Sequence, residues 1–233
     1  MERVYSLSLH DLRISEGRKG IVIIEGLRKH FQIPLTIHLV FDEDLTAQPE
    51  LSKYLLEQMR TGSLELVFHG ITHTCSKRVW EPLAFFHKYQ AEYLDNDAEH
   101  RKATRKSFAA NRYDMKMNMG ICPPCWLSSR ENTSLFESFQ PLYIEKLLFL
   151  HYPDKKVLSP VISLGSPSRV EAYCLKILAG TISLISGLFH LNRVRIAMHV
   201  CDLNMETSCR FFDEKISTFN RRGFRPVLLR ELK

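Results

Sequence analysis

Strand-like and helix-like segments alternate from one end of the 233-residue chain to the other. This alternation is typical of parallel strands joined by helical crossovers, because parallel neighbours need a long connection. The expected strands cover residues 5–12, 34–41, 64–68, 119–122, 143–149, 157–163, 194–199 and 225–230. The expected helices cover residues 15–31, 48–60, 97–113, 168–191 and 205–221. The pattern therefore predicts an α/β fold with seven or eight strands.

The composition supports one sizeable core, since 45% of the residues are apolar and 25% are charged. We expect a single domain over residues 1–233, with an insertion around residues 74–95 above the strand ends. No apolar run is long enough to span a bilayer, and the first residues lack the pattern of a secretion signal. A cytoplasmic protein without a membrane partner is expected. The six cysteines are too sparse for a disulfide scaffold, so most should be reduced.

The net charge of +6 permits an anionic partner, including nucleic acid. The densest basic stretch, residues 100–106, falls in a helix-like segment without interleaved aromatic residues. A solvated helix face explains this stretch better than a nucleic-acid site does, and we expect no nucleic-acid partner.

Unusual polar residues follow the ends of four expected strands. They are His10 and Asp11, His69, residues 122–126, and His199 with Asp202. In a parallel α/β barrel all strand carboxyl ends open on one face, where active sites are built. The four segments are therefore expected to meet in space.

His69 and His73 have a spacing that allows both imidazoles to bind one ion, if the chain turns helically after Gly70. The zinc-protease motif His-Glu-x-x-His has the same spacing, but here Gly70 occupies the position of its glutamate. A protease is thus disfavoured, and histidines in an ordinary loop are the alternative to a metal site.

The order His10-Asp11, His69-x-x-x-His73, a proline-rich third motif and a late-strand His199 resembles the polysaccharide deacetylase superfamily. The resemblance covers the whole chain and implies a distorted (β/α)7-8 barrel that removes acetyl groups from amino sugars. It implies that Asp11, His69 and His73 bind a divalent metal. Zinc suits this mixed nitrogen and oxygen set best, although manganese, cobalt and nickel are alternatives. A helix cap or turn is the structural alternative for Asp11.

The resemblance also implies that His199 acts as the acid, and Asp202 could fix the tautomer of its ring. This chain departs from the family pattern at two positions that concern the general base. The active enzymes carry an aspartate where this chain has His10, and an arginine in the motif that here reads Cys122-Pro123-Pro124-Cys125. His10 could itself be the base, because a histidine with a pKa near neutrality needs no cationic partner. It could equally support the ligands or be a fourth ligand, and His199 could be a plain strand-end histidine.

Pro123, Pro124 and Trp126 are expected to form an apolar wall for a sugar or acyl group, together with Trp80. A reversible disulfide between Cys122 and Cys125 is the alternative for this motif. The expected function is a metal-dependent hydrolase that removes an acyl group from an N-acylated sugar or related amide, so its partner is a small-molecule or glycan substrate. The alternative is a non-catalytic relative that binds metal or carbohydrate.

Overall fold

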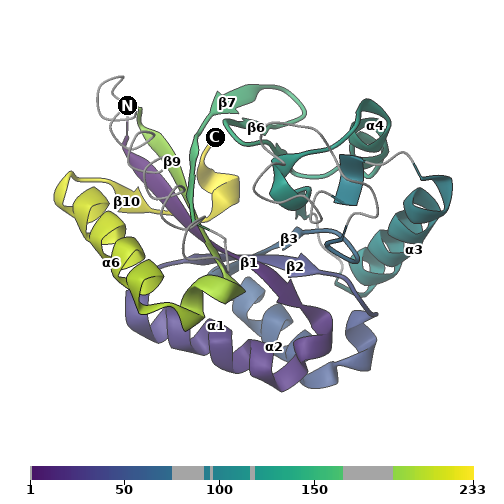
Figure 1. The fold of residues 1–233 in the computed structure, drawn as a ribbon, viewed down its shortest axis with the longest axis horizontal. Coiled ribbons are helices and arrows are strands. Elements are labelled where there is room, and N and C mark those ends of the chain that lie inside the picture. The colour runs from purple at the N-terminus through teal and green to yellow at the C-terminus, as the bar shows by residue number, and fades with distance from the viewer. Residues whose placement is uncertain (1, 75–91, 95–96, 116–118, 165–190) are drawn as a thin grey trace.

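The fold is built on one ten-stranded sheet with the strand order β7-β6-β5-β4-β3-β2-β1-β9-β8, and β10 pairs with β1 (Figure 1). The computed structural model describes residues 2–74, 92–94, 97–115, 119–164 and 191–233. The bounds of the strands are β1 Val4–Arg13, β2 Leu35–Val40, β3 Leu64–Phe68, β4 Gly120–Ile121, β5 Ile144–Glu145, β6 Phe149–His151, β7 Lys156–Leu158, β8 Val161–Ser163, β9 Arg193–His199 and β10 Arg225–Pro226. The prediction of an α/β fold is confirmed.

The centre of the sheet is parallel, and its strands are buried on both faces. Every residue of β2 and β3 is buried, as expected for strands covered by helices on one side and by the barrel interior on the other. The helices are α1 Gly17–Phe31, α2 Pro49–Arg60, α3 Ala98–Met115, α4 Arg130–Ser138 and α6 Glu206–Arg221. Figure 1 shows α6, α1, α2 and α3 around the outside of the sheet. The expected helices at residues 15–31, 48–60, 97–113 and 205–221 are therefore confirmed.

Three predicted strands are wrong in detail. The strand expected at residues 225–230 is shorter, because β10 ends at Pro226 and a 3-10 helix covers Leu229–Glu231. Residues 143–149 are not one parallel strand, because β5 ends at Glu145 and β6 begins at Phe149 and runs antiparallel to it. Residues 157–163 likewise form two strands, β7 and β8, which are separated by Ser159 and Pro160. Proline has no N–H for a ladder, so the chain leaves one strand and starts another there. Helix α4 was not predicted.

The two ends of the sheet meet without a regular ladder between them. Strands β7 and β8 lie at the two opposite ends of the strand order, yet only Ser159 and Pro160 separate them in sequence. The Val161 N–H donates to the carbonyl of Leu147 at 3.2 Å, across the same junction. The result is a barrel-like sheet that is not closed, which fits the expected distorted barrel.

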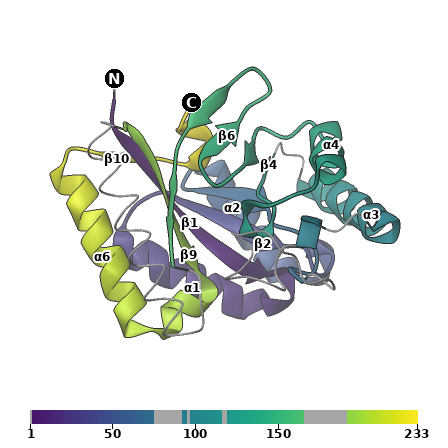
Figure 2. The same ribbon diagram turned by 45° about the horizontal axis from the view of Figure 1, so that its top comes forward.

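The chain ends lie on the same side of the molecule in both ribbon views (Figure 2). The expected helix at residues 168–191 lies almost entirely outside the described residues, and so does most of the expected insertion, including Trp80. Within the described residues, none of the helices is long and apolar enough to cross a membrane.

Candidate active site

A bulge at the end of β1 brings two consecutive side chains to the site. The pairing of β1 with β2 shifts register between Leu9 and Leu12, and Asp11 has a φ of 66°. Side chains on a regular strand point alternately to opposite faces, so neighbours such as His10 and Asp11 would normally diverge. The bulge and the left-handed backbone redirect Asp11. Both residues thereby reach the same region, as their sequence predicts.

The turn after β3 presents His69 and His73, but it is not the helical turn that the spacing suggested. Gly70 has a φ of 90° and His73 a φ of 57°, both in the left-handed region. A Cβ added at Gly70 would lie 2.3 Å from a carboxylate oxygen of Glu92, so a side chain has no room there. The paired histidines are confirmed as neighbours, although a glycine-dependent turn rather than a helix brings them together.

Asp11, His69 and His73 converge on one point. Oδ1 of Asp11 lies 2.9 Å from Nε2 of His73 and 3.3 Å from Nε2 of His69, and the two Nε2 atoms are 3.2 Å apart. Burial alone would raise the pKa of Asp11, but the neighbouring His73 and His199 hold it well below its usual value, so the carboxylate is charged. One carboxylate and two imidazoles within 4.8 Å of one another fit a divalent ion with open positions for other ligands.

The ring of His69 is oriented for this role. Its Nδ1 lies 2.8 Å from the carbonyl oxygen of Cys122 and donates its hydrogen there, which leaves the lone pair on Nε2. Burial lowers the pKa of His69 to about 4, so the ring is neutral near pH 7. A neutral imidazole with its free nitrogen facing a carboxylate is the form that binds a metal.

Glu92 holds the His69–His73 turn, a role that no pattern in the sequence indicates. Its side chain is buried and accepts hydrogen bonds from the backbone N–H groups of Ile71, Thr72 and His73 at 2.8–3.2 Å. His100 lies 2.9 Å from the same carboxylate. Burial would raise the pKa of Glu92, but His100 and these N–H groups lower it. A charged carboxylate thus fixes the backbone that carries His73, one of the two histidines that could hold a metal ion.

His10 has a tautomer that its hydrogen bonds determine. The Ser8 hydroxyl donates to the carbonyl of Ile196 at 3.2 Å, so its oxygen must accept from Nε2 of His10 at 3.1 Å. The hydrogen of His10 is therefore on Nε2, and the lone pair is on Nδ1. Among the described residues, this buried Nδ1 has no hydrogen-bond partner. Burial lowers the pKa of His10 well below its ordinary value, and the nearby His38 lowers it further, so the ring is neutral.

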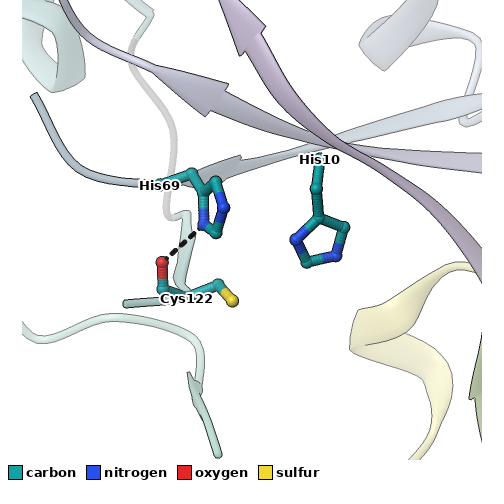
Figure 3. Close-up of side chains that lie close together, drawn as sticks. All are labelled: His10, His69 and Cys122. Carbon is teal, nitrogen blue, oxygen red and sulfur yellow. Dashed lines mark hydrogen bonds between the residues drawn. The ribbon is translucent and has the colours of Figure 1, made fainter. Parts of the chain in front are cut away.

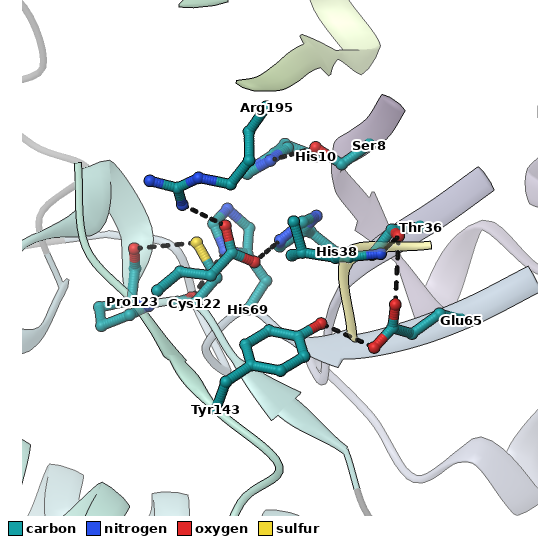
Figure 4. A network of polar contacts seen from close by, with 12 residues as sticks. Ser8, His10, Thr36, His38, Glu65, His69, Cys122, Pro123, Tyr143 and Arg195 are labelled. Carbon is teal, nitrogen blue, oxygen red and sulfur yellow. Dashed lines mark hydrogen bonds and ion pairs between the residues drawn. The ribbon is translucent and has the colours of Figure 1, made fainter. Parts of the chain in front are cut away.

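Behind His10 lies a buried ion-pair network that the sequence analysis missed (Figure 4). The His38 ring stacks on the His10 ring with centroids 3.7 Å apart. His38 pairs with Glu145, and the other oxygen of Glu145 lies 2.9 Å from the guanidinium of Arg195. No pattern in the sequence links His38, Glu145 and Arg195, because they come from three separate strands, β2, β5 and β9. In addition, the strand prediction around residue 145 was wrong.

His199 lies beside His10, since the two residues are ladder partners on β9 and β1. Nδ1 of His199 is 3.6 Å from Oδ2 of Asp202, which also accepts the His199 backbone N–H at 2.9 Å. Burial would lower the pKa of His199, but Asp11 and Asp202 raise it overall. The expected pairing of His199 with Asp202 is thus present, and it favours the protonated ring.

The third motif forms one side of the site. The Trp126 ring lies 5.5 Å from the His10 ring and 6.3 Å from the His199 ring, measured between centroids. Pro123 and Pro124 are buried next to it. No disulfide joins Cys122 to Cys125 in the described part of the chain, so the structure does not contain the alternative that the motif offered. The structure brings all the expected site residues within the described part of the chain to one region.

Comparisons by sequence found no matching protein-family model and no matching curated protein. Solved structures do match. A peptidoglycan N-acetylglucosamine deacetylase, Bc1960, in complex with a benzamide inhibitor-like compound, has 14% identity and a TM-score of 0.56, and the match covers 99% of this chain and 88% of that one. A family 4 acetyl xylan esterase from Clostridium thermocellum, in complex with a cobalt ion, has 15% identity and a TM-score of 0.54, with 99% and 90% covered.

A CE4 family pseudoenzyme from Bacillus anthracis also matches, with 12% identity and a TM-score of 0.53. The match covers 99% of this chain but only 65% of the pseudoenzyme, so the chain spans less than two thirds of that protein's length. These identities are low, and what the likeness establishes is the fold. The chain therefore has the fold of the CE4 polysaccharide deacetylases, the family that its sequence motifs resemble.

Proposed function

We propose that this protein is a metal-dependent deacetylase that hydrolyses the acyl group of an N-acetylated sugar or a related amide. The observation that carries the proposal is the convergence of Asp11, His69 and His73, with oxygen–nitrogen distances of 2.9 and 3.3 Å, beside a neutral His10. The structural neighbours named as deacetylases and as an acetyl xylan esterase support the class of reaction.

Asp11, His69 and His73 would hold the ion, and zinc is our proposed choice because it accepts mixed nitrogen and oxygen ligands. A bound divalent ion supplies Lewis acidity, which polarises an acyl carbonyl and favours the deprotonation of water. Because Asp11, His69 and His73 would bind the ion, the proton transfers fall to two other side chains at the site, His10 and His199.

His10 is suited to be the base. Its lone pair is on Nδ1, and its hydrogen is held on Nε2 by Ser8. Nδ1 would take the proton of the attacking water as the new C–O bond forms. The stacked His38 ring fixes the plane of His10, which keeps that nitrogen directed at the site.

His199 is suited to be the acid, because the charges of Asp11 and Asp202 favour its protonated form against the effect of burial. When the C–N bond breaks, His199 would give its proton to the leaving amine. Trp126, Pro123 and Pro124 would provide the apolar surface against which the sugar or the acyl group packs.

The experiment combines metal analysis with turnover. Wild type purified without chelator is expected to contain near one equivalent of a transition metal, and His69→Ala is expected to lose it. Metal-loaded wild type should hydrolyse members of a panel of acetamides and esters, including N-acetylglucosamine derivatives. His10→Ala and His199→Ala should keep the metal and lose turnover by about 10²- to 10⁴-fold, the usual contribution of a positioned acid or base.

The alternative function is metal or carbohydrate binding without turnover. Two observations favour it: the base position carries His10 rather than an aspartate, and one structural neighbour is named a pseudoenzyme. Metal content near one equivalent, together with no turnover of any panel member, would support this alternative. Absence of metal even after reconstitution would reject the hydrolase and the metal-binding alternative, and would leave carbohydrate binding without a metal.

A further inference from the structure

We propose that the site contains a second set of metal ligands, formed by His10, His69 and Cys122, which binds a thiophilic ion. This set shares only His69 with the first set, Asp11, His69 and His73. The inference concerns metal binding and does not depend on the proposed hydrolysis.

The three side chains of the second set come from the ends of three strands of the same sheet, β1, β3 and β4. One ring nitrogen of His10, one of His69 and the sulfur of Cys122 all lie within 4.8 Å of one another. Figure 3 shows the His10 ring and the Cys122 sulfur facing the space beside the His69 ring. All three residues are at most 2% exposed, so an ion there would be shielded from solvent.

The hydrogen bonds around this cluster leave the right atoms available. Ser8 occupies Nε2 of His10, so the buried Nδ1 is the nitrogen with a free lone pair. The Cys122 carbonyl occupies Nδ1 of His69, so its Nε2 is the free nitrogen. Among the described residues, the hydrogen bond that the Cys122 thiol makes is a weak one, with its sulfur 3.6 Å from the carbonyl oxygen of Pro123. Two imidazole lone pairs and a sulfur are thus directed at one place.

The chemistry of this set differs from that of the first. Cys122 would lose its proton to solvent on binding, since a coordinating thiol is deprotonated. A thiolate with two imidazoles favours soft ions such as Cd²⁺, whereas a carboxylate suits harder ions such as Mn²⁺ better. The two sets should therefore differ in metal preference.

A third cluster, His38, Cys122 and Glu145, has similar spacing but is a poorer candidate. His38 and Glu145 already pair with each other, and Glu145 also pairs with the guanidinium of Arg195. An ion would have to displace these contacts and would lie near a fixed positive charge.

Only one ion can bind at a time, because both sets need Nε2 of His69. An ion in the second set would also occupy Nδ1 of His10. If His10 is the base of the proposed reaction, thiophilic ions would inhibit that reaction, and this consequence alone rests on the proposed function.

The test compares Cd²⁺ and Mn²⁺ binding in wild type, Cys122→Ser, His73→Ala and a control, Cys209→Ser, by equilibrium dialysis and near-ultraviolet absorption. Cys209 lies on α6 and belongs to neither set. Cd²⁺ is expected to produce a thiolate-to-metal charge-transfer band in wild type, Cys209→Ser and His73→Ala. Cys122→Ser should lack the band and bind Cd²⁺ at least about tenfold more weakly. Mn²⁺ binding should show the reverse pattern, with loss in His73→Ala and retention in Cys122→Ser.

The inference is overturned if no band appears in either wild type or His73→Ala, or if Cys122→Ser retains the band. In that case, Mn²⁺ binding that is lost in His73→Ala would still support the first set and the proposed function. Conversely, a Cd²⁺ band without Mn²⁺ binding would support the second set and count against the first. Circular dichroism of each variant checks that it is folded.

Discussion

At the scale of single residues, the site depends on histidines that are buried and neutral. Ser8 and the Cys122 carbonyl each hold one ring hydrogen, so His10 and His69 present their lone pairs to the same region. Burial is the main cause of the low pKa of both rings. The burial that keeps these rings neutral, the form that can bind a metal, also lowers the stability of the folded protein in acid, because it makes the rings bind a proton less readily than in the unfolded chain.

The metal-free protein is therefore expected to lose stability as the pH falls from 6.5 towards 4. The pKa of His69 is about 4 in the folded protein and 6.5 in the unfolded chain, so the unfolded chain binds the proton first in this window. At about 1.4 kcal/mol per pKa unit, the loss from His69 approaches 3 kcal/mol. Urea unfolding of chelator-treated protein at several pH values measures it. His69→Gln should flatten the dependence, and an unchanged slope would contradict the assignment.

Glu92→Gln is expected to weaken metal binding by about 10- to 100-fold, the usual cost of losing a partner that orients a ligand. An amide has one carbonyl oxygen and no charge, so it cannot replace the carboxylate that accepts three backbone N–H groups and pairs with His100. Competition with a metal indicator measures the affinity. Glu99→Gln, an exposed position on α3, is the matched control, and equal affinities of the two variants would refute the role of Glu92.

At the scale of elements, the turn that follows β3, residues 69–73, shows what spacing can and cannot predict. The four-residue separation of His69 and His73 correctly predicted that the two rings are neighbours. It suggested a helical turn, but the backbone reverses through left-handed positions that Gly70 and His73 adopt. The reason is Glu92, which binds the N–H groups that a helical turn would direct elsewhere and which lies in a separate segment of the chain.

Gly70→Ala is expected to destabilise the protein by about 1–3 kcal/mol, because its φ of 90° is unfavourable for a side chain and its Cβ would clash with Glu92. Gly26→Ala is the control. Gly26 lies in α1 with nothing within 4 Å of an added Cβ, and the exchange should stabilise the helix by about 0.5–1 kcal/mol. Urea unfolding of both variants measures the difference. Similar effects of the two exchanges would show that the turn at Gly70 is not constrained.

The strand predictions failed where the chain changes direction within a short apolar stretch. Residues 143–149 and 157–163 read as continuous strands because the apolar pattern does not reveal a hairpin or a crossing. Pro160 was the available signal for the second break, since proline interrupts a ladder. Helix α4 was missed although Ser129 caps it, with its side chain accepting from the N–H of Asn132.

At the scale of the whole molecule, Arg195 ties together the region where the two ends of the sheet meet. Its guanidinium donates to the carbonyls of Ser159, Lys146 and Leu147 and pairs with Glu145, and its side chain is almost completely buried. The carbonyls belong to the connections on either side of the junction. Arg195 therefore replaces part of the missing ladder between β7 and β8, and through Glu145 and His38 it supports His10.

Arg195→Met is expected to destabilise the protein by about 3–5 kcal/mol, because it leaves the Glu145 carboxylate buried without its cationic partner. The double variant Glu145→Gln/Arg195→Met should lose less than the sum of the two single variants, since the unpaired charge is then removed. A double-mutant cycle from urea unfolding measures the coupling. Additive losses would mean that the ion pair does not stabilise the junction.

The α/β class, most of the helices and the clustering of Asp11, His69 and His73 could be predicted from the sequence, because they follow from local apolar periodicity and from polar residues at strand ends. The ring orientations of His10 and His69 could not be predicted, since the Ser8 hydroxyl that holds His10 donates to Ile196 on β9, and the carbonyl that holds His69 belongs to Cys122 after β4. Only the tertiary structure decided the roles of Glu92, Glu145 and Arg195, and the open junction between β7 and β8. Contacts between segments distant in the chain leave no periodic signal in a single sequence, so they could not be predicted from it.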